Sequence, residues 1–392
     1  MGIMYLTPDE ESMLNGEFGE GVQKAIELIV ALGKVYDADG LVDITSAHLS
    51  GASYKTIGDG GVRYLEDVSS NSIVAIPSTL NPLGMDRDRW REMHITEKFA
   101  KEQLKIIGLY KKMGVKTTCS CTPYLNDNVP SLGDHVAWAE SSALSFVNSY
   151  IGARTNREGG PGALAAAIVG KTANYGLHIT ENRAPTVVIE ADIENTIFSH
   201  SLLGQAVGMQ IGSGIPYYRG ISPEIEEVKT MAAAMAASGS VAMFHVEDVT
   251  PEASMFDISE LEVIHIGKKE IQNAYDVLNT DEDVQLMAFG CPHLTEREIH
   301  EMASFLKGKK KKKDVEIWFC TSADTRAKCS DDVKVLEEFG KVLADTCMVV
   351  APIESTFSVT GTNSAKAGNY LPTLCSQKAK CQDFTDLMKV VL

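Results

Sequence analysis

Three cysteines lie beside predicted strands of this chain: Cys121 in "TTCSCTPY", Cys291 in "FGCPH" and Cys347 in "DTCMVV". Three thiolates without a fourth protein ligand would leave one coordination position of an iron site open to substrate, whereas a structural zinc site is closed by four ligands. An open iron is a Lewis acid that can polarise a hydroxyl group and help it leave as water. Taken singly, each thiol also fits a buried small side chain.

The elements around these cysteines decide whether the thiols can meet. Cys121 follows the strand predicted in "VKTTCSC", and Cys291 lies between a strand at 284–289 and a capping box formed by Thr295 and Glu298. Ligands of open α/β sheets bind at the carboxyl ends of the strands. The strand pattern alone places Cys347 at the start of a strand "CMVVAP", at the opposite end, and favours Cys320 in "VEIWFC" instead.

The rest of the chain predicts an α/β fold. A capping box at Thr7 and apolar spacing predict a first helix from Pro8 and a second at 19–36, and another helix is expected at 96–113. The region 40–90 is rich in Gly, Ser, Asn and Pro, which predicts short strands joined by loops. From residue 260 onward, strand and helix patterns alternate, which predicts a parallel sheet.

Two further stretches are interpreted from composition. "TMAAAMAASGSVAMF" predicts a buried helix leading into a strand, and "KGKKKKK" at 307–313 predicts a solvated loop.

The chain has 392 residues, 44% of them hydrophobic, and a net charge of −17, which argues against binding nucleic acid or an anionic membrane. We expect a cytoplasmic protein, because the first residues are acidic rather than basic, and therefore free thiols rather than disulfides.

Basic residues and histidines gather in polar loops. Arginine suits carboxylates and lysine suits phosphates, so these loops predict anion binding by Lys55, Arg154, Arg157, Arg183 and Lys366. His48, His135 and His293 could each act as an acid, hold another ligand in place or serve a structural role. The motifs GxGxxG, GxxxxGK[ST], GxSxG and HExxH are absent, which leaves a dehydratase or a binding protein.

Five long motifs, in order, resemble the large (catalytic) subunit of the aconitase X family. They are "SAHLSGASYKTIGDGG", a segment from "TCSCTPYLNDNVP" to "GARTNREGG", "GCPHLT", "DTCMVVAPIE" and "TGTNSAKAGNYLP". The resemblance runs from the first helix to about residue 372. It implies an aconitase-like α/β fold over residues 1–392, with parallel or mixed sheets around a central cleft. From the pattern we expect subdomains near 1–115, 116–255 and 256–392.

By position, the resemblance makes Cys121, Cys291 and Cys347 the ligands of an iron–sulfur centre, with Cys119, Cys320, Cys329, Cys375 and Cys381 outside the ligand set. A 4Fe-4S cluster is favoured, and three thiolates also fit a 2Fe-2S cluster or a single iron ion. The substrate is then expected to contact the "GAS" and "NP" loops and three of the cations: Gly51, Ala52, Ser53, Asn81, Pro82, Lys55, Arg154 and Lys366.

The resemblance also implies a partner. Fused members of the family continue into a smaller swivelling domain that contributes a serine, so we expect a separate small subunit that carries the catalytic base and completes the active site. Two hydro-lyase activities occur in the family: dehydration of mevalonate 5-phosphate in an archaeal isoprenoid route, which the two-subunit form favours, and dehydration of cis-3-hydroxy-L-proline. A non-catalytic iron-binding or regulatory protein is the alternative from a different class.

Overall fold

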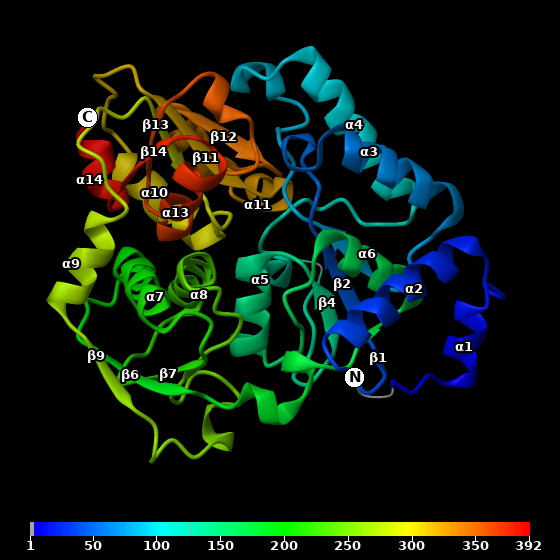
Figure 1. Ribbon diagram of the computed structural model, residues 1–392. Helices are drawn as coiled ribbons and strands as arrows, with labels where there is room; N and C mark the ends of the chain where they lie inside the picture. Colours follow the sequence, from blue (N-terminus) through cyan, green and yellow to red (C-terminus); the bar gives the residue numbers. More distant parts are fainter. Residues whose placement is uncertain (1–3, 127) are drawn as a thin grey trace.

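Parallel β-sheets flanked by helices make up most of the molecule, which confirms the predicted α/β class (Figure 1). The computed structural model describes residues 4–126 and 128–392. Within these residues, the strands form one antiparallel pair and three parallel sheets, with three, four and five strands. Each parallel sheet is built from a different part of the chain, and we call these parts the first, second and third units.

The first unit holds the antiparallel pair β1-β5 and the parallel sheet β3-β2-β4. Its strands are β1 (Leu41–Asp43), β2 (Ser46–Leu49), β3 (Ser78–Leu80), β4 (Val136–Trp138) and β5 (Lys171–Ala173). Its helices are α1 (Pro8–Leu14), α2 (Glu20–Val35), α3 (Tyr54–Asn71), α4 (Glu97–Lys112), α5 (Ser141–Phe146) and α6 (Gly160–Val169). The predicted capping box of Thr7 and Glu10 is present, and α2 and α4 match the predicted helices.

The second unit holds the sheet β8-β7-β6-β9. Its strands are β6 (Val187–Ala191), β7 (Pro216–Arg219), β8 (His245–Val246) and β9 (Val263–Ile266), and its helices are α7 (Ile197–Ile211), α8 (Ile225–Ser238) and α9 (Lys268–Asp276). α8 is the predicted buried helix. The strand β9 pairs with β6, although the alternation after residue 260 predicted that it would join the last sheet. Strand β4 likewise pairs with β2 of the first unit. The boundaries between the sheets therefore do not fall near residues 115 and 255, where the pattern placed the subdomain boundaries.

The third unit holds the sheet β12-β11-β10-β13-β14. Its strands are β10 (Leu286–Phe289), β11 (Glu316–Thr321), β12 (Lys341–Ala344), β13 (Val359–Thr362) and β14 (Lys378–Cys381). Its helices are α10 (Glu296–Leu306), α11 (Ala323–Lys328), α12 (Ser330–Glu337), α13 (Ala365–Leu374) and α14 (Phe384–Lys389). The predicted capping box of Thr295 and Glu298 opens α10.

Strand β12 corrects the sequence prediction in a way that matters for Cys347. The sequence pattern began the strand at Cys347, but the helix α12 ends at Glu337 and the strand is Lys341–Ala344. A Cβ on Gly340 would lie 2.4 Å from the carbonyl oxygen of Ile317, so only glycine allows the chain to join β11 at this point. Cys347 therefore follows the carboxyl end of β12.

Helix α3 corrects a second prediction, because "YKTIGDGG" is its first part rather than a loop. Ser53 caps it by accepting a hydrogen bond from the Lys55 amide at 3.2 Å, and Gly58, with φ of 55°, kinks it. Val62 and Leu65 are buried on the face toward the rest of the unit. Tertiary burial thus overrides the low helix propensity of the three glycines in this stretch.

The two faces of the sheet in the third unit pack against different parts of the protein. One face carries Phe289, Phe319 and the helices α10, α12 and α14 in a cluster within the third unit. The other face, with Trp318 and Cys320, packs against Met85 and Met93 of the first unit. The first and third units therefore share one hydrophobic core.

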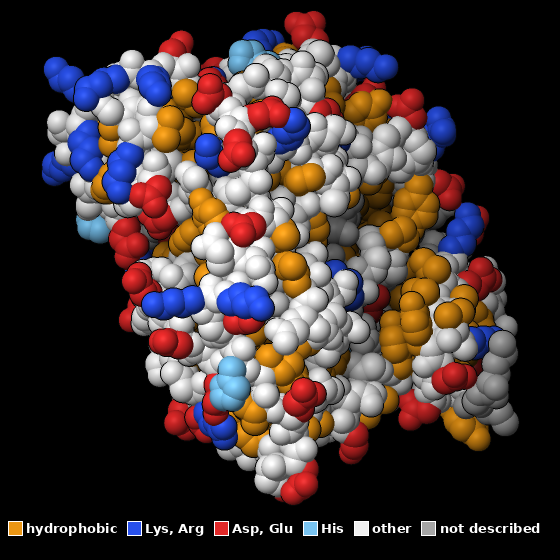
Figure 2. All heavy atoms as spheres, turned by 60° about the vertical axis from the view of Figure 1, so that its left-hand side comes forward, with side chains coloured by type: hydrophobic (Ala, Val, Ile, Leu, Met, Phe, Trp, Pro, Cys, Tyr) orange, Lys and Arg blue, Asp and Glu red, His pale blue; other side chains and the backbone are white. Residues whose placement is uncertain are grey.

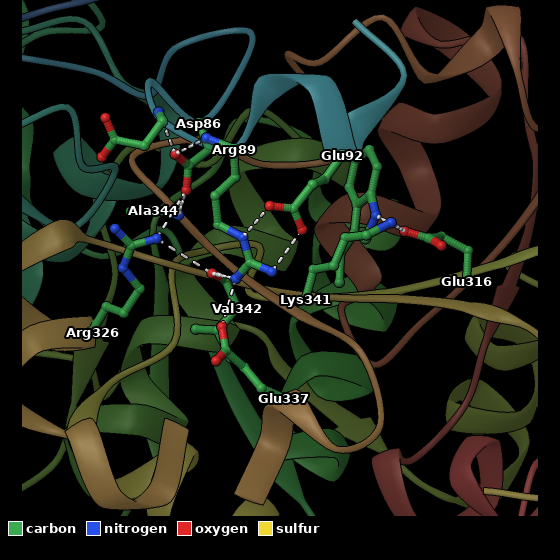
Figure 3. Close-up of polar contacts among 11 residues, drawn as sticks. Asp86, Arg89, Glu92, Glu316, Arg326, Glu337, Lys341, Val342 and Ala344 are labelled. Atoms are coloured by element: carbon green, nitrogen blue, oxygen red, sulfur yellow. Dashed lines mark hydrogen bonds and ion pairs between the residues drawn. The ribbon is translucent and has the colours of Figure 1, made fainter. Parts of the chain in front are cut away.

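Asp86 of the first unit fixes the position of β12 (Figure 3). One carboxylate oxygen accepts hydrogen bonds from the Ala344 amide at 2.7 Å and from Nη1 of Arg326 at 3.0 Å. The other accepts from the amides of Asp88 and Arg89 at 2.9 and 3.0 Å. Since the side chain is buried, these four donors replace the water that a carboxylate would otherwise bind.

The surface agrees with the acidic composition. Figure 2 shows Asp and Glu side chains spread over one face, with Lys and Arg side chains among them and a group of Lys and Arg side chains at one corner. The lysine-rich segment 307–313 is a largely exposed loop between α10 and β11, as predicted. Among the residues that the structure describes, no helix is both long and apolar enough to cross a membrane.

We predict that Asp86→Ala lowers the free energy of unfolding by about 3 kcal/mol, because it leaves Arg326 and three amides without their acceptor. Guanidinium denaturation followed by circular dichroism measures the change. Asp88→Ala is the matched control, since Asp88 is exposed. If both substitutions lowered the free energy of unfolding equally, the role given to Asp86 would be contradicted.

A second prediction concerns Glu158, whose burial raises its pKa from 4.5 to about 7 even though Oγ1 of Thr172 donates a hydrogen bond to it. The folded state then binds this proton more tightly than the unfolded state, so stability falls as the pH rises from about 4.5 to about 7. Glu158→Gln should raise Tm relative to the unchanged protein above pH 7, with a gain that shrinks toward pH 4.5.

Thermal unfolding between these pH values tests this prediction. The same substitution at the exposed Glu181 should leave Tm nearly unchanged throughout. A Tm difference for Glu158→Gln that does not vary with pH would show that Glu158 is not the group responsible.

Candidate active site

Cys121, Cys291 and Cys347 face one cavity of about 200 Å³ between the first and third units. The same cavity is lined by Asn81, Pro82, Ala139, Glu140, Ser141, Val349, Val350, Lys366 and Tyr370. The structure thus brings together three of the free thiols and three of the predicted substrate contacts, Asn81, Pro82 and Lys366. These residues are separated by up to 285 positions along the chain (Lys366 minus Asn81).

The cysteines reach the cavity from the ends of neighbouring elements. Cys291 follows β10, where Gly290 has φ of +98° and a Cβ would lie 2.0 Å from the Cys320 carbonyl oxygen. The peptide between Cys291 and Pro292 is cis, and Oγ of Ser364 donates to the Cys291 carbonyl oxygen. Cys121 follows an extended segment that makes a single parallel bridge, from Lys116 to Thr79, rather than the predicted strand.

Cys347 and Cys320 are distinguished by the corrected strand. β10 and β12 both run parallel to β11, so Cys291 and Cys347 leave the sheet at the same edge. Cys320 lies within β11, opposite Leu343 of β12, and is buried in the shared core rather than lining the cavity. The placement of Cys347 at the opposite end of the sheet, which the strand pattern predicted, is therefore wrong.

Burial makes all three thiols weak acids in the absence of a cation. It raises the pKa of Cys121 to about 12 and also raises those of Cys291 and Cys347. The His293 amide partly offsets this effect by donating to Sγ of Cys121 at 3.2 Å. Buried thiols gathered at one cavity suit a bound metal ion, whose charge replaces the proton as the counterion of each thiolate.

A buried ion pair of Lys366 and Glu140 lines the cavity beside the thiols. Nζ of Lys366 also donates to Oγ of Ser142 at 3.0 Å, and Glu140 accepts from the same hydroxyl at 2.6 Å. Burial raises the pKa of Glu140, but the charge of Lys366 and these hydrogen bonds outweigh it and hold the pKa below its usual value. Both groups are therefore charged at neutral pH.

Sequence reasoning missed Glu140, Ser141 and Tyr370. Glu140 caps α5 by accepting a hydrogen bond from the Ala143 amide. An acidic residue directly before "SSALSF" is a pattern that indicates a helix cap, but it does not indicate that Lys366 lies nearby. Tyr370 lies one helical turn after Lys366 on α13, so it shares the face of that helix.

The "GAS" loop borders the cavity without lining it. Oγ of Ser53 donates a hydrogen bond to the Val350 carbonyl oxygen at 2.8 Å. Nε2 of Gln103 donates to the Ala52 carbonyl oxygen at 2.6 Å. Gly51 has φ of +82°, a conformation that favours glycine. This loop supports the wall formed by Val349 and Val350.

The other predicted cations lie elsewhere. Lys55 is bound to Glu354 at 2.8 Å and to the Ala351 carbonyl oxygen at 3.0 Å, behind the cavity wall. Arg154 donates to the His178 carbonyl oxygen and to Thr180, both at 2.9 Å. Arg157 donates to Ala236, and Arg183 forms a buried pair with Glu252. The structure does not bring these four cations to the cavity.

The three histidines have different surroundings. His48 is buried between Thr79 and Asn81, and its Nε2 lies 3.4 Å from Oδ1 of Asn81, a residue of the cavity. Burial lowers the pKa of His48 to about 4, so the ring is neutral at pH 7. His135 pairs with His178 at 2.9 Å, away from the cavity. His293 lies among the three cysteine segments.

Comparison with known proteins settles the family. Three models of aconitase X match the chain: the first domain at residues 3–181, the second at 185–276 and the third at 284–392. The chain belongs to the aconitase X family. The three matched segments correspond to the three units defined by the sheets, and together they span almost the whole chain.

Two relatives and one solved structure cover this aconitase X chain almost completely. The phosphomevalonate dehydratase large subunit of Methanocaldococcus jannaschii is 46% identical over 98% of this chain and 100% of its own length. That of Methanothermobacter thermautotrophicus is 47% identical over 99% of each chain. The crystal structure of Thermococcus kodakaraensis aconitase X, in its holo-form, superposes with a TM-score of 0.92 at 39% identity, over 99% of this chain and 100% of that one.

A more distant relative has a different activity in its name. The cis-3-hydroxy-L-proline dehydratase of Hypocrea jecorina is 32% identical to this chain, over 96% of this chain and 68% of the relative. The matched segment spans about two thirds of that protein. Aconitase X chains therefore occur both at the length of this one and as part of longer proteins.

The Lys366–Glu140 pair generates a prediction about stability. Lys366→Met leaves a buried carboxylate without its cation and should lower the free energy of unfolding by about 3–5 kcal/mol. The double variant Glu140→Gln/Lys366→Met should lose clearly less, because neither charge then remains unpaired. Guanidinium denaturation of both proteins measures the difference, and equal losses would mean that the two residues are not coupled.

Proposed function

We propose that this chain is the large subunit of a hydro-lyase that converts (R)-mevalonate 5-phosphate to trans-anhydromevalonate 5-phosphate. The observation that carries the proposal is the cavity at which three separate thiols meet Asn81, Pro82 and Lys366. It is supported by identities of 46% and 47% to full-length proteins named phosphomevalonate dehydratase large subunit.

The donor atoms fit an iron–sulfur centre. Cys121, Cys291 and Cys347 would hold it, and a 4Fe-4S cluster is favoured, with a 2Fe-2S cluster as an alternative. A single iron ion is disfavoured, because the three sulfur atoms do not all lie within 4.8 Å of one another. When bound, such a centre supplies a Lewis acid for the departing hydroxyl group. Cys320, buried inside β11, stays outside the proposed ligand set, as does Cys119, which accepts a hydrogen bond from Arg87 at 3.0 Å.

The chain's own residues would bind and orient the substrate. We assign Asn81, Pro82 and the ammonium of Lys366 to substrate contact, with Gly51, Ala52 and Ser53 supporting the adjacent wall. Glu140 neutralises Lys366, so the cavity has little net positive charge with which to hold a phosphate. We therefore propose that a small subunit closes the site, supplies further phosphate ligands and carries the catalytic base.

The alternative substrate is cis-3-hydroxy-L-proline. Relatives named for this activity are 32% and 29% identical, which is lower than the identity to four phosphomevalonate dehydratase large subunits, at 41% or more. A non-catalytic iron-binding role is disfavoured because the thiols, the "NP" loop and Lys366 all face one cavity.

Metal analysis with single substitutions tests the proposed centre. In anaerobically purified protein, Cys121→Ser, Cys291→Ser and Cys347→Ser should each lose most of the iron and sulfide that the unchanged protein binds. Cys320→Ser is the control, because this thiol is buried nearby and should leave the content unchanged. Full iron retention in any of the first three variants would remove that cysteine from the ligand set.

Turnover tests the substrate. With the small subunit added, the iron-loaded protein should dehydrate mevalonate 5-phosphate and show little activity on cis-3-hydroxy-L-proline. The large subunit alone should be inactive or nearly so. Preference for the hydroxyproline would establish the alternative, and loss of turnover with both substrates would favour the non-catalytic role.

A further inference from the structure

The His293 side chain contacts Ser120 and Thr346, the residues that precede Cys121 and Cys347, and His293 itself follows Cys291 by two residues. Its Nδ1 lies 3.3 Å from Oγ of Ser120, and its Nε2 lies 3.0 Å from the carbonyl oxygen of Thr346. Its backbone amide donates to Sγ of Cys121 at 3.2 Å. One buried residue therefore connects the segments of all three cysteines.

The partners determine which ring nitrogen carries the proton. The Thr346 carbonyl oxygen can only accept, so Nε2 must be the donor. Nδ1 is then free to accept from the Ser120 hydroxyl, whose oxygen accepts in turn from the Thr122 amide at 3.1 Å. A single neutral tautomer satisfies every contact, so the ring has a defined orientation.

The backbone of His293 is held from the second unit. Nζ of Lys229, on α8, donates to the His293 carbonyl oxygen at 3.0 Å and forms a buried ion pair with Glu298. Glu298 also accepts from the Thr295 amide at 2.8 Å, at the start of α10. The turn that carries Cys291 is thus fixed on both sides, and the His293 amide keeps its direction toward Cys121.

We propose that His293 is a positioning residue that sets the spacing of the three cysteine segments and aims an amide hydrogen bond at Cys121. The inference rests on the proposed function, in which these cysteines hold an iron–sulfur centre. Hydrogen bonds to cysteine sulfur tune the reduction potential of such centres, and groups that orient ligands affect how tightly a metal is held. Loss of the ring contacts should therefore change both properties.

The test compares His293→Phe, which keeps a ring of similar size without either nitrogen, with His245→Phe. His245 is also fully buried, and its Nε2 lies 2.8 Å from the Arg183 carbonyl oxygen in the second unit. Both proteins are reconstituted anaerobically with iron and sulfide. Iron release to a chelator, the electron paramagnetic resonance spectrum and the midpoint potential are measured beside circular dichroism.

We expect His293→Phe to release iron roughly tenfold faster than the unchanged protein, with a shifted spectrum and potential, and His245→Phe to match the unchanged protein. His293→Gln, whose amide can donate to Thr346, should restore part of the difference. Ser120→Ala, which removes one contact and keeps the ring, should make iron release about threefold faster. This variant provides the test if His293→Phe does not fold.

Two failures are distinguishable. If the unchanged protein takes up no iron and sulfide, the proposed centre itself is wrong. If it is loaded normally and both His293→Phe and Ser120→Ala match it in iron release, spectrum and potential, then His293 does not position the cysteines. Equal changes in His245→Phe would also overturn the inference, because they would reflect a general effect of losing a buried histidine.

Discussion

The buried carboxylate of Asp86 is the contact on which the cavity depends. It belongs to the first unit, yet it accepts the amide of Ala344 at the end of β12 and the guanidinium of Arg326 in the third unit. Beside it, the Leu83 amide donates to the Asp345 carbonyl oxygen at 2.8 Å. Asn81 and Cys347 flank these contacts along the chain, so the same interaction that joins the two units brings a predicted substrate loop to a thiol.

The electrostatics of the cavity follow from burial. Thiols and an ion pair that lose water need partners within the protein, and the partners here are backbone amides, Ser142 and the opposite charge. Lys366 from α13 and Glu140, the N-cap of α5, meet across the first and third units. The cavity is therefore lined by charged and polar groups as well as by Val349 and Val350.

Much of this organisation could be predicted from the sequence. The capping boxes at Thr7 and Thr295, the helices α2 and α4 and the parallel sheet around β10 have strong local signals. Local signals failed at Lys341–Ala344 and at α3, where close packing on Ile317 and burial of Val62 and Leu65 decide the structure. The proximity of Glu140 and Lys366, 226 residues apart, has no local signal, because it depends on how the first and third units pack together.

The wide separation of the cysteines also sets an order of assembly. Under the proposed function, the ligands at positions 121, 291 and 347 meet only when the first and third units have docked. The hydrophobic cores and Asp86 would then shape this pocket before the proposed centre is inserted. Insertion would be a late step on a folded apoprotein, and a damaged centre could be replaced without dismantling the protein around it.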